Sequence, residues 1–244
     1  MKKIFFLGSK NIGAKCFEYL VDNSKNLEIE IIGILTNSRG HKLLEIAKNN
    51  SIEVYESLDS FLTIKELDLA ISVQYHEILS KQHLSVAKNG IFNLHMAPMP
   101  EYRGCNQFSF AIINREESFG TSIHLMDDGI DTGQLYFEKR FDIPSDIWVK
   151  ELFDITEKHS FDLFKDSIRK LINLQLTPIQ KSMSCPKYFH LRKDISKINI
   201  VDLDWPKEKI ERHIRATAMP GFLGPFLDIK GTKMSINFLN TDEH

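Results

Sequence analysis

The sequence predicts an α/β fold: a Rossmann-like, mostly parallel sheet flanked by helices, with a small α+β C-terminal appendage. Three observations predict it. Short apolar runs alternate with helical patterns over the first 100 residues, two alternating segments then indicate antiparallel strands, and the periodicity fades near residue 180. We therefore expect two domains, residues 1–180 and residues 181–244.

The first 100 residues are typical of repeated strand–helix units. Strands are expected where apolar runs occur, and helices where apolar residues recur at helical spacing. Because strands that alternate with helices form βαβ units, the sheet is expected to be parallel and doubly wound. The expected strands are 4–7, 29–35, 52–55, 69–73 and 90–96, and the expected helices are 11–20 and 41–48.

The pattern after residue 100 predicts two antiparallel strands, a long helix and the small C-terminal appendage. Two alternating segments enclose a Gly- and Asp-rich loop, and a long amphipathic pattern follows. The expected elements are strands 121–126 and 134–141, a helix that runs to about residue 174 with Ser145 or Asp146 as its N-cap, a helix over 207–217, and a hairpin around 230–231.

Composition excludes several classes of protein. Of the 244 residues, 42% are hydrophobic and 26% charged, which excludes a disordered tail, a collagen-like fibre and a coiled coil. The formal charge of −2 argues against a nucleic-acid binder. No apolar run reaches the roughly 18–20 residues of a membrane helix. The widely spaced Cys16, Cys105 and Cys185 form neither a disulfide framework nor a zinc ribbon. We expect a soluble cytoplasmic protein without membrane or nucleic-acid partners.

The expected strand 90–96 breaks the pattern of a buried parallel strand, which is normally apolar on both faces. Asn93 and His95 occupy alternate positions and therefore share a face. They lie at the carboxyl end of the strand, where open α/β sheets bind ligands. Burying an amide and an imidazole costs a few kcal/mol unless each finds partners. A satisfied structural pair is the alternative interpretation. His124 is expected to be packed, with contact to the site as the alternative.

Three stretches carry a resemblance to a known family: Asn93-Leu94-His95, Pro100-Glu101-Tyr102-Arg103-Gly104, and His124-Leu125-Met126-Asp127-Asp128-Gly129-Ile130-Asp131-Thr132-Gly133. They resemble the folate-dependent formyltransferases, which act on glycinamide ribonucleotide, methionyl-tRNA or sugar nucleotides. Residues 106–112 are similar to the sugar-nucleotide branch, the dTDP-amino-dideoxyhexose N-formyltransferases, more than to the tRNA branch.

The resemblance implies transfer of a formyl group from 10-formyltetrahydrofolate to an amine, with no metal. His95 would accept the proton of the amine. Asn93 would donate a hydrogen bond to the oxyanion, and Asp131 would hold a water or the imidazole and favour its protonated form. The resemblance places the folate against two loops, at Gln74, Tyr75, Ile78, Leu79, Met126, Asp128 and Ile130.

The resemblance also implies a dTDP-linked amino-dideoxy sugar as the acceptor, in the synthesis of bacterial O-antigen or lipopolysaccharide. We expect dTDP-4-amino-4,6-dideoxyglucose. Since a helix N-terminus offers backbone N–H groups to a phosphate, the turn at residues 9–10 is a candidate contact, with a plain βα turn as the alternative. The same analogy predicts a homodimer through the C-terminal segment. The expected substrate-binding residues are Ser9, Lys10, Tyr102, Arg103 and Asn106.

Rival functions differ in how well the residues fit them. The loop 8–13 lacks the glycine spacing of a dinucleotide site, and a single Asp-Thr-Gly tripeptide excludes an aspartic protease. Methionyl-tRNA formyltransferase is the alternative enzyme, although its complete C-terminal barrel would not fit within 244 residues. Glycinamide ribonucleotide formylation fits less well. A catalytically silent α/β binding module is the alternative from another class. The position of the amine, C3 or C4, and the base, thymine or uracil, stay open.

Overall fold

The computed structural model describes residues 1–181 and 188–236, so that Cys185 lies outside the described residues. It divides the chain into two compact units, each built from separate segments. The first unit contains residues 1–103, 120–140 and 156–187, and the second contains residues 104–119, 141–155 and 188–244. The division that we expected at residue 180 therefore lies close to the last junction between the units, and two inner segments of the predicted first domain belong to the second unit.

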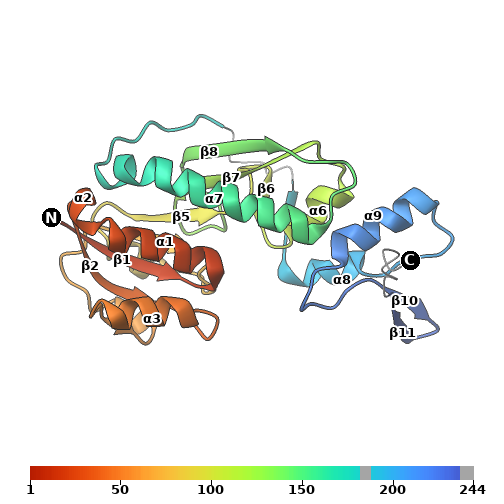
Figure 1. Cartoon of the computed structure of the whole chain (residues 1–244), viewed down its shortest axis with the longest axis horizontal. Coiled ribbons are helices and arrows are strands. Elements are labelled where there is room, and N and C mark those ends of the chain that lie inside the picture. The colour runs from red at the N-terminus through yellow and green to blue at the C-terminus, as the bar shows by residue number, and fades with distance from the viewer. Residues whose placement is uncertain (182–187, 237–244) are drawn as a thin grey trace, which may run out of the picture. The chain divides into compact units, whose positions relative to one another are not determined.

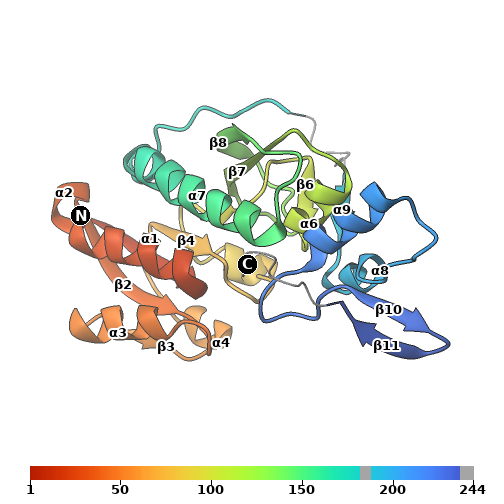
Figure 2. The ribbon, with the colours of Figure 1, turned by 45° about the vertical axis from the view of Figure 1, so that its right-hand side comes forward.

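A seven-stranded sheet forms the framework, in the order β3-β2-β1-β4-β5-β7-β8, with its strands labelled between the two views (Figures 1 and 2). The first five strands pair in parallel, and β7 pairs with β5 in the antiparallel direction. This confirms the predicted fold class, including the antiparallel strand. The strands are β1 (Lys2–Gly8), β2 (Ile29–Leu35), β3 (Val54–Tyr55), β4 (Leu69–Val73), β5 (Ile91–His95), β7 (Ser118–Leu125) and β8 (Leu135–Asp142).

Helices α1 (Lys10–Asp22) and α7 (Val149–Ile172) lie side by side in both views of the ribbon (Figures 1 and 2). Phe6 of β1 packs against Phe17 of α1, with ring centroids 5.2 Å apart. Tyr19 of α1 makes edge-on contacts with Phe161 and Phe164 of α7. Strand β1 is thus apolar on this side because an apolar helix face covers it. Helices α2 (Ser24–Leu27), α3 (His41–Asn49) and α5 (Lys81–Leu84) complete the first unit.

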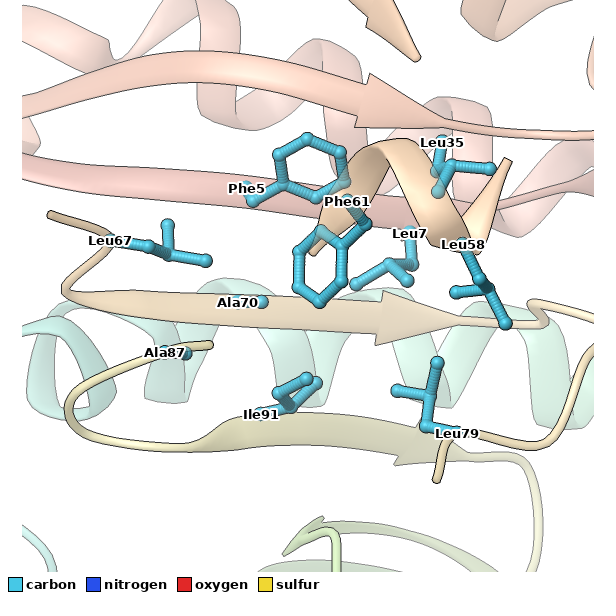
Figure 3. Packing of buried hydrophobic residues seen from close by; sticks show 10 residues of the cluster. All are labelled: Phe5, Leu7, Leu35, Leu58, Phe61, Leu67, Ala70, Leu79, Ala87 and Ile91. Atoms are coloured by element: carbon cyan, nitrogen blue, oxygen red, sulfur yellow. The ribbon is translucent and has the colours of Figure 1, made fainter. Parts of the chain in front are cut away.

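The short helix α4 (Leu58–Phe61) packs on the opposite face of the sheet (Figure 3). Strand β5 contributes Ile91 to this core, and side chains two residues apart on a strand share a face. Asn93 and His95 therefore continue the same face toward the carboxyl end of β5. The core cluster contains Phe5, Leu7, Leu35, Leu58, Phe61, Leu67, Ala70, Leu79, Ala87 and Ile91.

The second unit is built around two packed helices, α6 (Gln107–Ile113) and α9 (Lys207–Thr217). Its predicted hairpin is confirmed as the antiparallel pair β10 (Phe226–Ile229) and β11 (Thr232–Ser235). Lys230 and Gly231 both have positive φ, as a type I′ hairpin turn requires. The other elements are β6 (Tyr102–Gly104), which ends in this unit, β9 (Tyr188–His190), a 3₁₀ helix (Arg192–Asp194) and α8 (Ile195–Ile198). In neither unit do the described residues form a helix that is long and apolar enough to cross a bilayer.

The predicted start of the long helix at Ser145 or Asp146 is wrong. Residues 144–147 form a separate turn, in which Ile147 N–H donates to the Pro144 carbonyl, and α7 begins at Val149. The carboxylate of Glu151 accepts a hydrogen bond from Trp148 N–H at 2.9 Å. Glu151 thus satisfies one free N–H group at the start of the helix, as the acidic residue of a capping box does.

The core on the α4 face yields a stability prediction. Phe61 is fully buried and its neighbour Leu62 is 37% exposed. Phe61→Ala should lower the free energy of unfolding by about 3–5 kcal/mol, because it leaves a cavity among packed side chains. Leu62→Ala, the matched control, should cost less than about 1.5 kcal/mol because little surface is newly exposed. Urea denaturation of both variants measures the difference, and equal losses would contradict the packing described.

Candidate active site

The register of β5 and β7 places four polar side chains together. Asn93 pairs with His124 and His95 pairs with Ser122, and cross-strand partners project to the same face of a sheet. The loop that follows β7 then returns across this face and carries Asp131. Its path depends on Gly133, where a Cβ atom would lie 1.6 Å from the Leu125 carbonyl oxygen. Only glycine fits at this close approach.

Asp131 lies between two imidazole rings. Its Oδ1 atom is 3.7 Å from His95 Nδ1 and 3.5 Å from His124 Nε2. The side chains of Asp131, His95 and His124 are only 14%, 8% and 2% exposed. Because water is largely excluded, charges at these positions interact more strongly than they would at the surface.

Backbone carbonyls determine which nitrogen of each neutral ring carries the proton. His95 Nε2 is 2.8 Å from the Tyr102 carbonyl oxygen, and His124 Nδ1 is 3.1 Å from the Leu125 carbonyl oxygen. Since a carbonyl oxygen can only accept, these two nitrogens donate. The other nitrogens, His95 Nδ1 and His124 Nε2, therefore carry the lone pairs, and both face Asp131.

The orientation of Asn93 follows from His124. Asn93 Nδ2 is 3.3 Å from His124 Nε2, which is an acceptor in the neutral ring. One N–H of the amide is directed to this ring, and the second N–H is left to serve another acceptor. Asn93 is partly exposed, whereas the other four residues of β5 are buried. The amide is therefore the part of β5 that is most open to a bound molecule.

This arrangement combines a proton acceptor with a hydrogen-bond donor. A proton that moves to His95 Nδ1 or His124 Nε2 forms an ion pair with Asp131. The free N–H of Asn93 can donate to an oxygen on which negative charge develops. These two functions suit attack of a neutral amine on a carbonyl carbon, with the imidazole as general base.

The structure brings together the three residues predicted to be catalytic, Asn93, His95 and Asp131, and adds His124 to them. His124 is buried, as expected, but its ring contacts both Asn93 and Asp131. The signal that identifies it is its pairing with Asn93 across β5 and β7. Alternation within a single strand cannot reveal that pairing.

The first loop predicted to hold folate follows β4. Gln74 has a positive φ, and its side-chain oxygen accepts a hydrogen bond from Lys10 Nζ at 2.7 Å. Leu79 belongs to the core cluster, whereas Ile78 is exposed. Burial and a 2.7 Å hydrogen bond to Glu77 raise the pKa of Tyr75 well above its ordinary value, so that its hydroxyl stays neutral.

The second predicted folate loop follows β7 and lies near the first. Met126 packs against the core cluster that contains Leu79. Asp128 forms an exposed ion pair with Lys81 at 2.9 Å, which links this loop to the start of α5. Ile130 is exposed. Each loop is thus anchored by one apolar side chain and presents another apolar side chain to solvent.

The residues predicted to bind the substrate divide between the two units. In the first unit, the Ser9 hydroxyl donates to the Gln74 carbonyl, so that Ser9 and Lys10 both tie the start of α1 to residue 74. Tyr102 is buried and Arg103 is partly exposed. In the second unit, Asn106 Nδ2 donates to the carbonyls of residues 191 and 192, at 2.9 and 3.1 Å.

Across the described ranges 1–181 and 188–236, no group of three His, Cys, Asp or Glu side chains has an arrangement that could hold a metal ion. The metal-free chemistry that the resemblance implies stays a prediction.

Comparison with known proteins identifies the family. The family described as "Formyl transferase" matches residues 47–160. This range includes the polar residues of the site, Asn93, His95, His124 and Asp131. A methionyl-tRNA formyltransferase of Clostridium novyi (strain NT) is 31% identical over 230 residues, which cover 86% of this chain and 71% of that protein. The chain belongs to the formyl transferase family.

Solved structures of formyl transferases share the fold of this family member. An N-formyltransferase from Helicobacter canadensis, in complex with folinic acid and dTDP-3-aminofucose, has a TM-score of 0.78 at 24% identity and covers 96% of this chain and 86% of its own. A 4-N formyltransferase from Francisella tularensis has a TM-score of 0.78 at 19% identity and covers 97% of both chains. These likenesses confirm the fold.

The position of Asp131 predicts the effect of removing its charge. Asp131→Asn keeps the shape of the side chain but no longer stabilises a protonated imidazole, so the rate of formyl transfer should fall by about 10²–10⁴-fold. Asp59→Asn, the same change on the exposed side of α4, is the matched control and should leave the rate unchanged. Steady-state kinetics with a formyl-folate donor measures both variants. A rate for Asp131→Asn close to that of the parent protein would contradict the assignment.

Proposed function

We propose that this protein is a sugar N-formyltransferase, which transfers a formyl group from 10-formyltetrahydrofolate to the amine of a dTDP-linked amino-dideoxy sugar. The observation that carries the proposal is the placement of the Asp131 carboxylate between the lone-pair nitrogens of His95 and His124, with the Asn93 amide beside them. Membership in the formyl transferase family supports the reaction type.

The reaction begins when the sugar amine attacks the formyl carbon of the folate. His95 Nδ1 accepts the proton that the amine loses, and Asp131 stabilises the resulting imidazolium. The carbonyl electron pair moves to the formyl oxygen, where the Asn93 N–H donates to it; such a donor contributes roughly 3–4 kcal/mol in comparable sites. Collapse of the intermediate breaks the bond to folate N10, which takes the proton from His95. The products are an N-formyl sugar and tetrahydrofolate.

The two loops at residues 74–79 and 126–130 would hold the folate. Their anchoring in the core cluster keeps them in place, and the exposed side chains of Ile78 and Ile130 offer apolar surface to a flat ring. Exposed large apolar side chains are typical of surfaces that contact ligands. The folinic acid bound to the Helicobacter canadensis enzyme supports a folate donor here.

One comparison supports a dTDP-linked amino sugar as the acceptor, and a second supports an amine at position 4. The Helicobacter canadensis enzyme was solved with dTDP-3-aminofucose, and the match to the Francisella tularensis 4-N formyltransferase extends over 97% of both chains. We propose dTDP-4-amino-4,6-dideoxyglucose, made for O-antigen or lipopolysaccharide in the cytoplasm. Residues 1–180 would act as the catalytic domain and 181–244 as the small C-terminal domain. The substrate contacts proposed are Ser9, Lys10, Tyr102, Arg103 and Asn106.

Formylation of methionyl-tRNA is the second candidate, favoured by the 31% identity to the Clostridium novyi enzyme. A tRNA ligand is held mainly by cationic side chains on phosphates. The chain has 31 basic and 33 acidic residues, which does not favour a polyanion.

A panel of acceptors tests the proposed function. Formyl-folate turnover should be highest with dTDP-4-amino-4,6-dideoxyglucose among dTDP- and UDP-linked 3-amino and 4-amino sugars, and initiator methionyl-tRNA should give none. His95→Asn should reduce kcat by about 10²–10⁴-fold, because the base is lost. Calorimetry should find sugar-nucleotide binding to this variant largely intact. Turnover with methionyl-tRNA alone would establish the second candidate and refute the first.

We also propose that the protein is a homodimer that associates through the C-terminal segment. Several large apolar side chains of the second unit are exposed to solvent, and exposed apolar surface is typical of interaction sites. A second copy of the chain would remove them from water. The most exposed of them are Leu203, Phe222, Leu223, Ile229 and Met234.

Charge introduced at this surface should disrupt the dimer. In Phe222→Glu combined with Leu223→Glu, a carboxylate would be buried in each position, and light scattering after gel filtration should give the mass of a monomer. Leu44→Glu, on an exposed position of α3, is the matched control and should remain dimeric. A monomeric parent protein, or a double variant of unchanged mass, would overturn this interface.

A further inference from the structure

Four charged side chains of the first unit surround the loop between β5 and β6. We call Glu101, Glu138, Arg140 and Lys181 the charged quartet. Arg140 Nη2 lies 2.6 Å from Glu101 Oε1 and 2.8 Å from Glu138 Oε1. Lys181 Nζ lies 2.8 Å from Glu138 Oε2 and 3.9 Å from Glu101 Oε1. The four formal charges cancel, and each cation contacts both carboxylates.

The quartet differs from an ordinary surface ion pair in its burial. The side chains of Glu101, Glu138, Arg140 and Lys181 are 31%, 14%, 35% and 26% exposed. Burial alone would lower the pKa of Arg140, but its hydrogen bonds to the two carboxylates outweigh this and raise it, so the guanidinium stays charged. Such a network fixes the positions of its members better than isolated exposed pairs do.

One oxygen of the quartet lowers the stability that the quartet contributes. Glu101 Oε2 is buried and has no hydrogen-bond partner among the residues that the structure describes. An unsatisfied buried acceptor costs free energy, and buried ion pairs by themselves are weak evidence of a stabilising role. This cost is consistent with a role in placing the loop.

Two members of the quartet hold the loop directly. Lys181 Nζ donates to the Met99 carbonyl at 3.1 Å, and Arg140 holds the Glu101 carboxylate. Inside the loop, Tyr102 N–H donates to the Pro98 carbonyl at 2.9 Å. The next backbone group is the Tyr102 carbonyl, which accepts the hydrogen bond from His95 Nε2. The quartet is thus connected to the catalytic imidazole through one short loop.

Two acceptors compete for the single proton of neutral His95. The Tyr102 carbonyl is at hydrogen-bond distance from Nε2, 2.8 Å, whereas Asp131 Oδ1 is 3.7 Å from Nδ1. A carboxylate is intrinsically the stronger acceptor. If the loop moved away, the proton would transfer to Nδ1 and point at Asp131, and the ring would lose the lone pair that faces this carboxylate.

We propose that the charged quartet is a positioning device for His95: it holds the Tyr102 carbonyl against Nε2 and thereby keeps the lone pair on Nδ1, beside Asp131. The kinetic consequence rests on the proposed function, in which Nδ1 is the base. The position of the proton on the neutral His95 ring does not depend on the proposed function.

The test combines imidazole spectroscopy with kinetics. Lys181→Met removes the donor to Met99, and Glu101→Gln removes the charge that Arg140 holds. Long-range ¹H–¹⁵N spectra, with the His95 signals assigned through His95→Asn, report which ring nitrogen carries the proton. In both variants the Nδ1–H form of His95 should gain population. The kcat should fall by about 10–100-fold while KM for both substrates changes by less than about threefold, because only the alignment of the base is lost.

Two comparisons separate positioning from folding. Lys181→Arg keeps a charged donor and should restore both the Nε2–H form and kcat. Glu66→Gln removes the exposed ion pair with Lys3 and should change neither. If variants that unfold at lower temperature keep the parent tautomer and kcat, the quartet is merely structural and the proposal is wrong. If the parent protein formylates no acceptor, the proposed function fails, and the tautomer shift still decides whether the quartet positions His95.

Discussion

The contact on which the site depends is the approach of one carboxylate oxygen, Asp131 Oδ1, to a ring nitrogen of each of two imidazoles. A proton on either of these nitrogens is stabilised by the carboxylate, and the stabilisation is strong because water is largely excluded. The cluster is therefore arranged to take up a proton at a defined place. Two backbone carbonyls maintain this arrangement, because they occupy the opposite nitrogen of each ring.

The sheet brings these groups together because polar side chains replace apolar ones at the carboxyl end of β5. Along one face of β5, apolar Ile91 is followed by Asn93 and His95, while α4 covers the apolar part of that face. At the carboxyl end, the loop that carries Asp131 takes the place of a covering helix. A polar cluster can persist there because each buried group has a partner on a neighbouring strand or loop.

Much of this fold could be predicted from local patterns. The strands 29–35 and 69–73 and the helix 207–217 have the predicted bounds, because each corresponds to a continuous apolar run or to apolar residues at helical spacing. Helix α4 has only four residues, too few to show a helical period. The start of α7 was predicted wrongly, because Ser and Asp favour an N-cap by type, whereas residues 144–147 form a separate turn and the helix begins after it.

The site was predictable to a smaller extent. Alternation identified the shared face of Asn93 and His95, and the family resemblance supplied Asp131. For His124, contact with the site was only the alternative to packing, since its position depends on the register that pairs it with Asn93, 31 residues away in sequence. The tautomers depend on the backbone carbonyls of Tyr102 and Leu125. Every residue has a backbone carbonyl, so the residue type does not indicate which carbonyl will contact a histidine. Side-chain chemistry could thus be predicted, but the geometry that directs it required the structure.

The most direct test is a crystal structure of the protein with 5-formyltetrahydrofolate, which does not react, and the amino sugar nucleotide that it accepts best. The account predicts that the amine nitrogen lies within about 3.5 Å of His95 Nδ1 and that the formyl oxygen faces the amide nitrogen of Asn93. An amine bound far from both residues, with His95 and Asp131 unchanged and no reacting atom near them, would contradict it.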